Sequence, residues 1–166
     1  MKITFGHKKD KDLIIKSVKE SFEDIKLLSL ATVKKDNSSS ICCVFYAYDK
    51  EFNLYYWSEK STQLSINIKH NNKVAVEIVD SHQKFGSILK GLKIYGTARQ
   101  ASISELMIGG NAYMKRFVEV KNLIKSIKDF SSRYKSKLYK IKIDKIIVLD
   151  EAKFGKWGYR ELLIER

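Results

Sequence analysis

Three short apolar segments separated by tight turns constrain the fold of this chain more than any other feature of its sequence. The segments are LLSLATV (27–33), SICCVFYAY (40–48) and NLYYW (53–57), and they are rich in β-branched and aromatic residues, as β-strands are. Polar turns join them at 35–38 and 49–52. Strands connected this closely pair antiparallel, because a parallel pair needs a long crossover. The pattern therefore predicts an antiparallel meander.

Further segments extend this pattern to a mainly β fold with a few helices. The period-2 alternation and the β-branched residues predict strands at 73–79, 88–100 and 139–149, and a final edge strand at 156–164. In the strand at 88–100, Gly91 and Gly96 indicate a bulge or a close approach of the backbone. Strands in runs are not a βαβ series. We expect a small antiparallel β-barrel of about six to seven strands, with helices packed outside it.

Three segments carry the spacing of helices. Apolar residues recur at helical intervals over 12–25, and Asp12 is the expected N-cap. A short helix is expected over 61–71 with Ser61 as its N-cap. A third helix, with a solvated lysine-rich face over 114–128, is expected to bury Tyr113, Phe117, Val120, Ile124 and Ile127.

The length and composition indicate one globular domain over residues 1–166, with its core at about 27–160. The apolar share is 44%, and the chain contains no proline, so that a Pro-rich linker is excluded. It lacks a secretory signal and an apolar run of membrane-spanning length. Cys42 and Cys43 are neighbours on a strand and point to opposite faces, which suits neither a disulfide nor a metal site. We expect a cytoplasmic protein that binds no metal.

The net charge of +13 raises the question of a nucleic-acid partner. Nineteen acidic residues are interspersed with 32 basic ones, and lysine dominates over arginine. This mixture is typical of solvated surfaces, so we do not expect nucleic-acid binding to be the main function. The excess charge favours anionic ligands in general, phosphate esters included.

Familiar catalytic motifs are absent from the sequence. It contains no GxGxxG, GxxxxGK[ST], HExxH or CxxC motif and no nucleophile elbow. His7, His70 and His82 lie far apart among polar residues and are expected at the surface. An apolar strand would not activate a cysteine nucleophile. If the protein is an enzyme, a cofactor carries its chemistry.

The segment YYWSEKSTQL (55–64) is the most informative one for function. A strand ends at Ser58, and a short helix opens with Ser61, Thr62 and Gln63. Hydroxyl groups, Lys60 and free N–H groups at a helix start can bind an anion. Ordinary capping of a surface helix explains the same residues.

The ordered pattern from LATV through YAYDKEFNLYYWSEKSTQL and NNKVAV to GLKIYGTARQ resembles the pyridoxamine 5′-phosphate oxidase-like family, the FMN-binding split barrels. The closing KLYKIKIDKIIVLDEAKFGKWG is similar to the last strands of that family, so the resemblance covers about residues 27–160. It implies a homodimer that holds FMN where the two copies meet. Tyr46, Tyr48 and Trp57 are the residues that we expect at the interface.

The resemblance also implies a set of flavin-binding residues. The second strand would lie along the isoalloxazine ring, the third would touch it at its end, and the helix start would bind the phosphate. A polar residue of the fifth strand and two C-terminal residues of the partner subunit would complete the site. The corresponding residues here are Ile41, Cys42, Cys43, Val44, Tyr56, Trp57, Ser58, Lys60, Ser61, Thr62, Gln63, Lys93, Trp157 and Arg160.

The chain departs from the family pattern at both ends of this site. Many members carry Arg or Lys at the positions of Thr62 and Gln63, so two cationic contacts to the phosphate are lost, and Lys60 is the nearest substitute. The basic C-terminal extension of the oxidase itself is missing. Relatives that degrade haem use a C-terminal histidine, and no histidine follows His82. Other relatives bind a deazaflavin, which the sequence leaves open.

Two classes of function are therefore expected. The first is an FMN-dependent oxidoreductase that acts on an unknown small substrate without a dedicated protein acid or base. The second is a non-catalytic module that binds flavin or, through its basic surface, nucleic acid.

Overall fold

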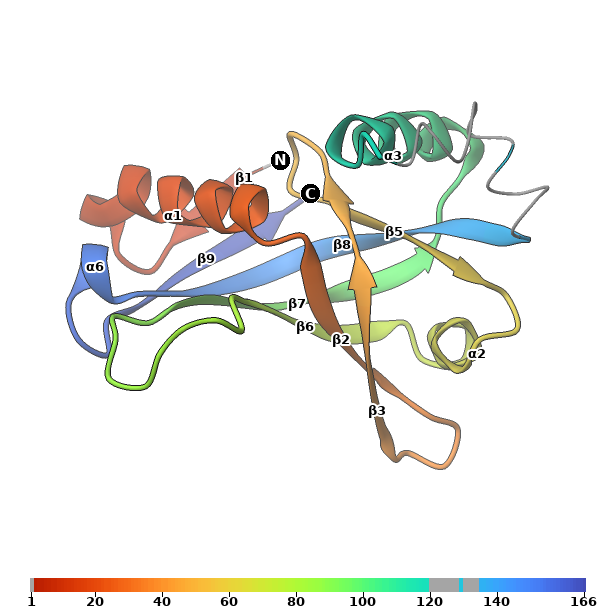
Figure 1. The fold of residues 1–166 in the computed structure, drawn as a ribbon, viewed down its shortest axis with the longest axis horizontal. Coiled ribbons are helices and arrows are strands. Elements are labelled where there is room, and N and C mark those ends of the chain that lie inside the picture. The colour runs from red at the N-terminus through yellow and green to blue at the C-terminus, as the bar shows by residue number, and fades with distance from the viewer. Residues whose placement is uncertain (1, 120–128, 130–134) are drawn as a thin grey trace.

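The computed structural model describes residues 2–119, 129 and 135–166 (Figure 1). The strands are β1 (Lys2–Phe5), β2 (Leu27–Val33), β3 (Ser39–Phe45), β4 (Ala47–Tyr48), β5 (Leu54–Glu59), β6 (Lys73–Val79), β7 (Lys90–Gln100), β8 (Ser136–Asp150) and β9 (Tyr159–Glu165). The helices are η1 (Lys8–Asp10), α1 (Lys11–Asp24), α2 (Gln63–His70), α3 (Ile103–Arg116) and α6 (Glu151–Phe154).

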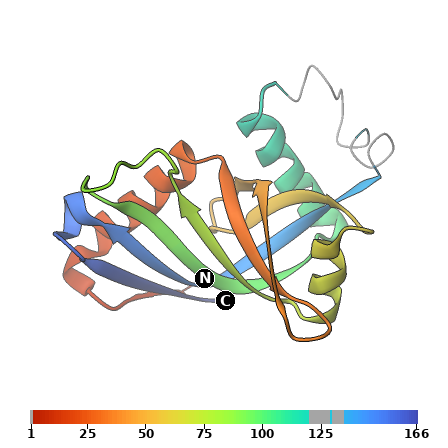
Figure 2. The same ribbon diagram turned by 60° about the horizontal axis from the view of Figure 1, so that its bottom comes forward.

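One antiparallel sheet, in the order β1-β9-β8-β7-β6-β2-β3, forms the body of the fold. β8 is its longest strand, and β7 pairs along one edge of it from Lys90 to Gln100. The other edge of β8 is shared by β5 at one end and β9 at the other. Because β8 joins these two groups, the sheet curls into the barrel seen in Figure 2, and the predicted split barrel is confirmed.

The bulge predicted in the strand at 88–100 lies at Gly96. The pairing of β7 with β8 shifts between Tyr95 and Gly96. A Cβ atom at Gly96 would lie 2.1 Å from the carbonyl oxygen of Lys142. Only glycine permits this approach, which bends β7 where the barrel curves.

The predicted meander is wrong at its second strand. The segment 40–48 breaks into β3, which pairs with β2, and β4, which pairs with β5. Tyr46 separates them: its N–H group donates to the carbonyl oxygen of Lys26 at 3.3 Å, and its ring is fully buried. The chain turns at this buried ring, so that it pairs with β2 before Tyr46 and with β5 after it. β5 in turn pairs with β8 on its other side.

The helix termini also differ from expectation. α1 begins at Lys11, so Asp12 lies in its first turn and Asp10 is the N-cap residue. Thr62, and not Ser61, caps α2 by accepting a hydrogen bond from the N–H group of Ser65.

β9 is not the edge strand, because the unexpected strand β1 pairs with it.

The described helix in this region, α3, begins earlier in the chain than predicted. α3 begins after a capping box formed by Ser102 and Glu105, and it ends at Arg116, with Phe117 as its C-cap residue. Of the predicted face, Tyr113 and Phe117 are buried, whereas 120–128 lie outside the described residues. The apolar side chains of the first turns point outward, with Ile103 88% exposed, so that the helical spacing of buried residues was hidden.

The core lies inside the curled sheet and is closed by α1. Side chains from the inner faces of six strands meet Ile14, Val18 and Phe22 of α1 in one apolar cluster. Figure 1 places α1 and α6 at one end of the sheet and α2 at the other. Among the helices that the structure describes, none is long and apolar enough to cross a membrane.

Candidate functional site

The segment that was expected to bind phosphate is a closed cluster of hydroxyl groups. The Oγ atoms of Ser58 and Thr62 lie 2.8 Å apart, and the Oγ atom of Ser65 lies 3.1 Å from that of Ser58. Ser65 also donates to the carbonyl oxygen of Glu59 at 2.7 Å. These hydroxyl groups bond to one another and join the end of β5 to the start of α2.

Groups other than these bonded hydroxyls are available to bind an anion near the start of α2. The first N–H groups of a helix have no partner within the helix, and Thr62 satisfies only that of Ser65. The N–H group of Gln63 at the helix start therefore remains for an outside acceptor. Lys60 and Ser61 are exposed beside it. The side chain of Gln63 donates to Asn67 at 2.7 Å instead of facing the helix start. An anion would therefore meet backbone N–H groups and Lys60.

β3 presents two different faces. Ile41 and Cys43 point outward, and Ile41 is 71% exposed. Cys42 and Val44 point inward and pack against the core. Burial raises the pKa of the Cys42 thiol, as does the neighbouring Cys43, which disfavours a nucleophilic thiolate.

Tyr56 and Trp57 of β5 do not share the exposed face of β3. Tyr56 is fully buried, and its ring stacks on Tyr139 at 5.5 Å between centroids. Trp57 is half-buried and packs against a small cluster that contains Tyr113 and Phe117. A ligand on the outer face of β3 could contact Tyr56 only through its backbone.

Lys93 lies on the outer face of the sheet but not next to β3. Cross-strand pairing places Cys43 opposite Ser29, Ser29 opposite Glu77, and Glu77 opposite Lys93. Three strand spacings, about 14 Å, therefore separate Cys43 from Lys93. The Nζ atom of Lys93 lies 5.8 Å from the centroid of the Tyr159 ring.

The two C-terminal residues lie at the end of the sheet opposite α2. Trp157 is 64% exposed in the turn between α6 and β9. Arg160 pairs with Asp10 at 2.5 Å and stacks on Phe154 at 4.8 Å, and so it has structural contacts of its own. Within one copy, the turn between α6 and β9 lies at the end of the sheet opposite the start of α2 (Figure 1).

Two of the three residues expected at a dimer interface have other contacts. Tyr46 is fully buried, with the guanidinium of Arg116 5.0 Å from its ring centroid, so its assignment to an interface is wrong. Tyr48 is half-buried, donates to a carboxylate oxygen of Glu23, and lies 5.4 Å from the same guanidinium. Burial and this carboxylate raise the pKa of Tyr48 to about 12.

Large apolar side chains instead gather on the outer face of the sheet. The most exposed belong to β3, where Phe45 is 52% exposed, and others come from four neighbouring strands. The group consists of Leu27, Ile41, Phe45, Val79, Tyr95, Tyr159 and Leu163. We call this group the apolar patch, and exposed charged side chains such as Glu77 and Lys93 lie between its members on the same face.

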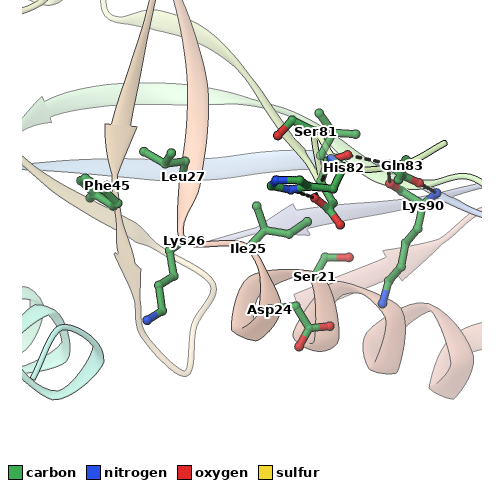
Figure 3. A pocket seen from close by; sticks show the side chains of 12 residues that line it. Ser21, Asp24, Ile25, Lys26, Leu27, Phe45, Ser81, His82, Gln83 and Lys90 are labelled. Carbon is green, nitrogen blue, oxygen red and sulfur yellow. Dashed lines mark hydrogen bonds and ion pairs between the residues drawn. The ribbon is translucent and has the colours of Figure 1, made fainter.

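A cleft of about 440 Å³ opens at one end of this face, between the C-terminal end of α1 and the turn after β6 (Figure 3). We call it the α1 cleft. Its lining residues are Ser21, Asp24, Ile25, Lys26, Leu27, Phe45, Val79, Asp80, Ser81, His82, Gln83 and Lys90.

His82 stands on the rim of this cleft in a defined setting that sequence reasoning did not foresee. Its Nδ1 atom lies 3.0 Å from Oδ1 of Asp80, which also accepts the N–H group of His82 at 2.9 Å. The side chain is 92% exposed, as expected from its polar surroundings. The i, i+2 spacing of Asp80 and His82 was the one available signal. No cluster of metal-binding side chains occurs among the residues that the structure describes.

Comparisons with known proteins agree with this architecture. The family model described as pyridoxamine 5′-phosphate oxidase matches residues 14–149. No curated protein matches the sequence.

Similar folds occur in proteins with different names and ligands. ChuZ of Campylobacter jejuni is 16% identical with a TM-score of 0.71, over 93% of this chain and 60% of its own length. A heme binding protein of Mycobacterium smegmatis is 13% identical with a TM-score of 0.66, over 88% and 57%. An F420 reductase is 18% identical with a TM-score of 0.57, over 77% and 94%. The chain thus spans less than two thirds of the first two, and these likenesses show the fold alone.

Proposed function

The chain belongs to the pyridoxamine 5′-phosphate oxidase family, and on that premise we propose that it binds FMN between two copies of itself as an oxidoreductase. The proposal rests mainly on the family match, which runs through β3, the hydroxyl cluster and β7. Bound flavin would supply the hydride or electron transfer that the protein side chains cannot perform. Its small substrate is unidentified.

The residues near the start of α2 fit the phosphate end of FMN, although not in the manner typical of the family. The N–H group of Gln63 and the side chains of Lys60 and Ser61 are available to phosphate oxygens. Thr62 is held by its capping bond, so it would contribute through its position rather than its hydroxyl group. One cation in place of two favours weaker retention of the cofactor.

The distances within one copy support a shared site. Lys93 lies three strand spacings from Cys43, and the turn between α6 and β9 lies at the end of the sheet opposite α2 (Figure 1), so one flavin could meet β3 and α2 together with these C-terminal residues and Lys93 only if the latter came from a partner. The exposed apolar patch on the outer sheet face is the surface that such a partner would cover. Cys43 and Ile41 lie on that same face.

The visible spectrum of the purified protein, with mass spectrometry of the compound released on denaturation, tests this function. We expect the absorption bands of an oxidised flavin and the mass of FMN. A haem spectrum, or release of a deazaflavin, would replace FMN by another cofactor. Failure of added FMN to bind would favour the non-catalytic module.

Sedimentation velocity at micromolar concentration tests the shared site. We expect a dimer, and we expect Ile41→Asp to shift it toward monomer because a charge enters the apolar face. Ile103→Asp, a change at a still more exposed isoleucine on α3, is the control. A monomeric wild-type protein would contradict the shared site.

A further inference from the structure

Trp157 is held in an unusual backbone conformation in the turn between α6 and β9. Its φ angle is 59°, which lies in the left-handed region that large side chains seldom adopt. Trp157 is nevertheless 64% exposed, so burial in the core does not explain the conformation. Residues held in sparsely populated backbone regions cluster at functional sites. The bonds that hold this turn therefore indicate how the indole is placed.

The carboxylate of Glu151, the first residue of α6, bridges this turn to the loop between β6 and β7. Its Oε1 atom accepts the N–H group of Trp157 at 3.1 Å, and its Oε2 atom accepts the N–H group of Leu89 at 2.9 Å. The N–H group of Glu151 donates in turn to the carbonyl oxygen of Leu89 at 3.0 Å. Figures 1 and 2 show the turn and the loop side by side at one end of the sheet. One side chain thus joins Trp157 to this loop.

The loop that carries Leu89 is itself bonded to the sheet. Gln83 donates to the carbonyl oxygen of Lys90, the first residue of β7, at 3.0 Å and accepts its N–H group at 2.7 Å. The backbone N–H groups of Leu89 and Trp157 lower the pKa of Glu151 below its ordinary value, so the carboxylate is ionised at neutral pH and accepts both bonds. Glu151 therefore connects Trp157, through a series of hydrogen bonds, to the start of β7.

An exposed indole in a fixed position suits contact with a planar ring. Aromatic rings pack on one another in specific relative orientations, and a side chain that is ordered before contact loses less entropy when the contact forms. Within one copy, the turn lies at the end of the sheet opposite α2 (Figure 1). A flavin that Trp157 contacts would therefore be held by the partner.

We propose that Glu151 is a positioning residue that holds Trp157 ready to pack on the flavin ring bound by a partner copy. This inference rests on the proposed function. Glu151 contacts neither the flavin nor the substrate, and it acts on flavin binding through Trp157 alone.

Tryptophan fluorescence of the full-length, flavin-free protein tests whether Glu151 holds the indole. The chain contains two tryptophans, so Trp57→Phe leaves Trp157 as the single indole. In this background we expect Glu151→Gln to lower the fluorescence anisotropy, because an amide offers one acceptor oxygen in place of two. Glu165→Gln, at a carboxylate that pairs with Lys2, is the control. An unchanged anisotropy in Glu151→Gln would overturn the proposal.

Titration with FMN tests whether the positioned indole reaches the flavin. We expect Trp157→Ala and Glu151→Gln each to weaken FMN binding about threefold to tenfold, the scale of one aromatic contact. The double variant should bind FMN no more weakly than Trp157→Ala, because a positioning residue has no effect once the side chain that it positions is missing. Additive losses would show that Glu151 acts on the fold in general, and they would overturn the proposal.

The two measurements separate this inference from the proposed function. If the wild type binds no FMN, the proposed function fails and the flavin contact of Trp157 fails with it, whatever the anisotropy shows. If the wild type and Trp157→Ala bind FMN equally well, the proposed function stands and this inference alone is overturned.

Discussion

The ring of Tyr55 in β5 lies directly against the Cα atom of Gly109 in α3. A Cβ atom at position 109 would lie 2.3 Å from Cδ1 of Tyr55. Tyr55 is itself held by a 2.9 Å hydrogen bond from its hydroxyl group to Asp49. The ring cannot easily retreat, and α3 packs on the barrel because glycine leaves room for it.

Gly109→Ala should therefore destabilise the protein despite the higher helix propensity of alanine. Overpacking costs about 1–3 kcal/mol, whereas alanine recovers about 1 kcal/mol in a helix. We expect a lower midpoint of denaturant unfolding. Asn111→Ala, an exposed change in the same helix, should not lower it. Equal stability of the two variants would show that the contact with Tyr55 is dispensable.

Arg116 ties the end of α3 to the end of α1. Its guanidinium donates to the carbonyl oxygens of Phe22 and Ile25, the latter at 2.9 Å, and its side chain is only 8% exposed. Arg116→Met should lower the free energy of unfolding by about 1.5–3 kcal/mol, the scale of hydrogen bonds to a charged group. Chemical denaturation measures this, with exposed Lys115→Met as the control. An unchanged free energy of unfolding in Arg116→Met would show that Arg116 does not stabilise this contact.

Acid should weaken the contact between α1 and α6. Hydrogen bonds from Lys153 and Lys90 lower the pKa of Glu20 from 4.5 to about 2. Because the folded-state pKa is depressed, the stabilisation is complete above pH 4.5 and is lost as the pH falls toward 2.

Urea unfolding between about pH 6 and pH 2 tests this prediction, because this range brackets the titration of Glu20. Glu20→Gln should flatten the decline, whereas Asp144→Asn, an exposed carboxylate on β8, should follow the wild type. A decline of the same steepness in Glu20→Gln would mean that other carboxylates account for it.

Lys60 should contribute to FMN retention. It is the exposed cation beside the start of α2, so Lys60→Ala should weaken FMN binding by about 0.5–1.5 kcal/mol, the scale of one hydrogen bond. Lys50→Ala, in the turn before β5, is the control, and FMN titration is the measurement. If both variants bind like the wild type, the phosphate lies elsewhere.

Lys93 should raise the reduction potential of the flavin. A cation near the ring stabilises its reduced, anionic form, so Lys93→Met should lower the midpoint potential and leave the fold intact. Potentiometric titration of the holoprotein compares it with Lys142→Met, which is exposed on β8. Identical midpoints in the wild type and Lys93→Met would place Lys93 outside the flavin site.

Most of the strands could be predicted because their cause is local. The segments at 27–33 and 73–79 match β2 and β6 residue for residue, since apolar runs bounded by turns form strands almost anywhere in a barrel. The bulge at Gly96 was visible for a similar reason, because glycine within an alternating strand indicates a close approach. The start of α3 was missed because its apolar side chains face outward.

The sequence by itself determined the split barrel, the family and the junction of a strand with a short helix at Ser58–Gln63. All three depend on short ordered patterns along the chain. Only the tertiary structure decided which residues share a surface. It buried Tyr46, separated Lys93 from Cys43 by three strand spacings, and assembled the α1 cleft from Ser21, Phe45 and His82. These outcomes depend on pairing between distant strands and on packing of α1, and neither leaves a periodic trace in the sequence.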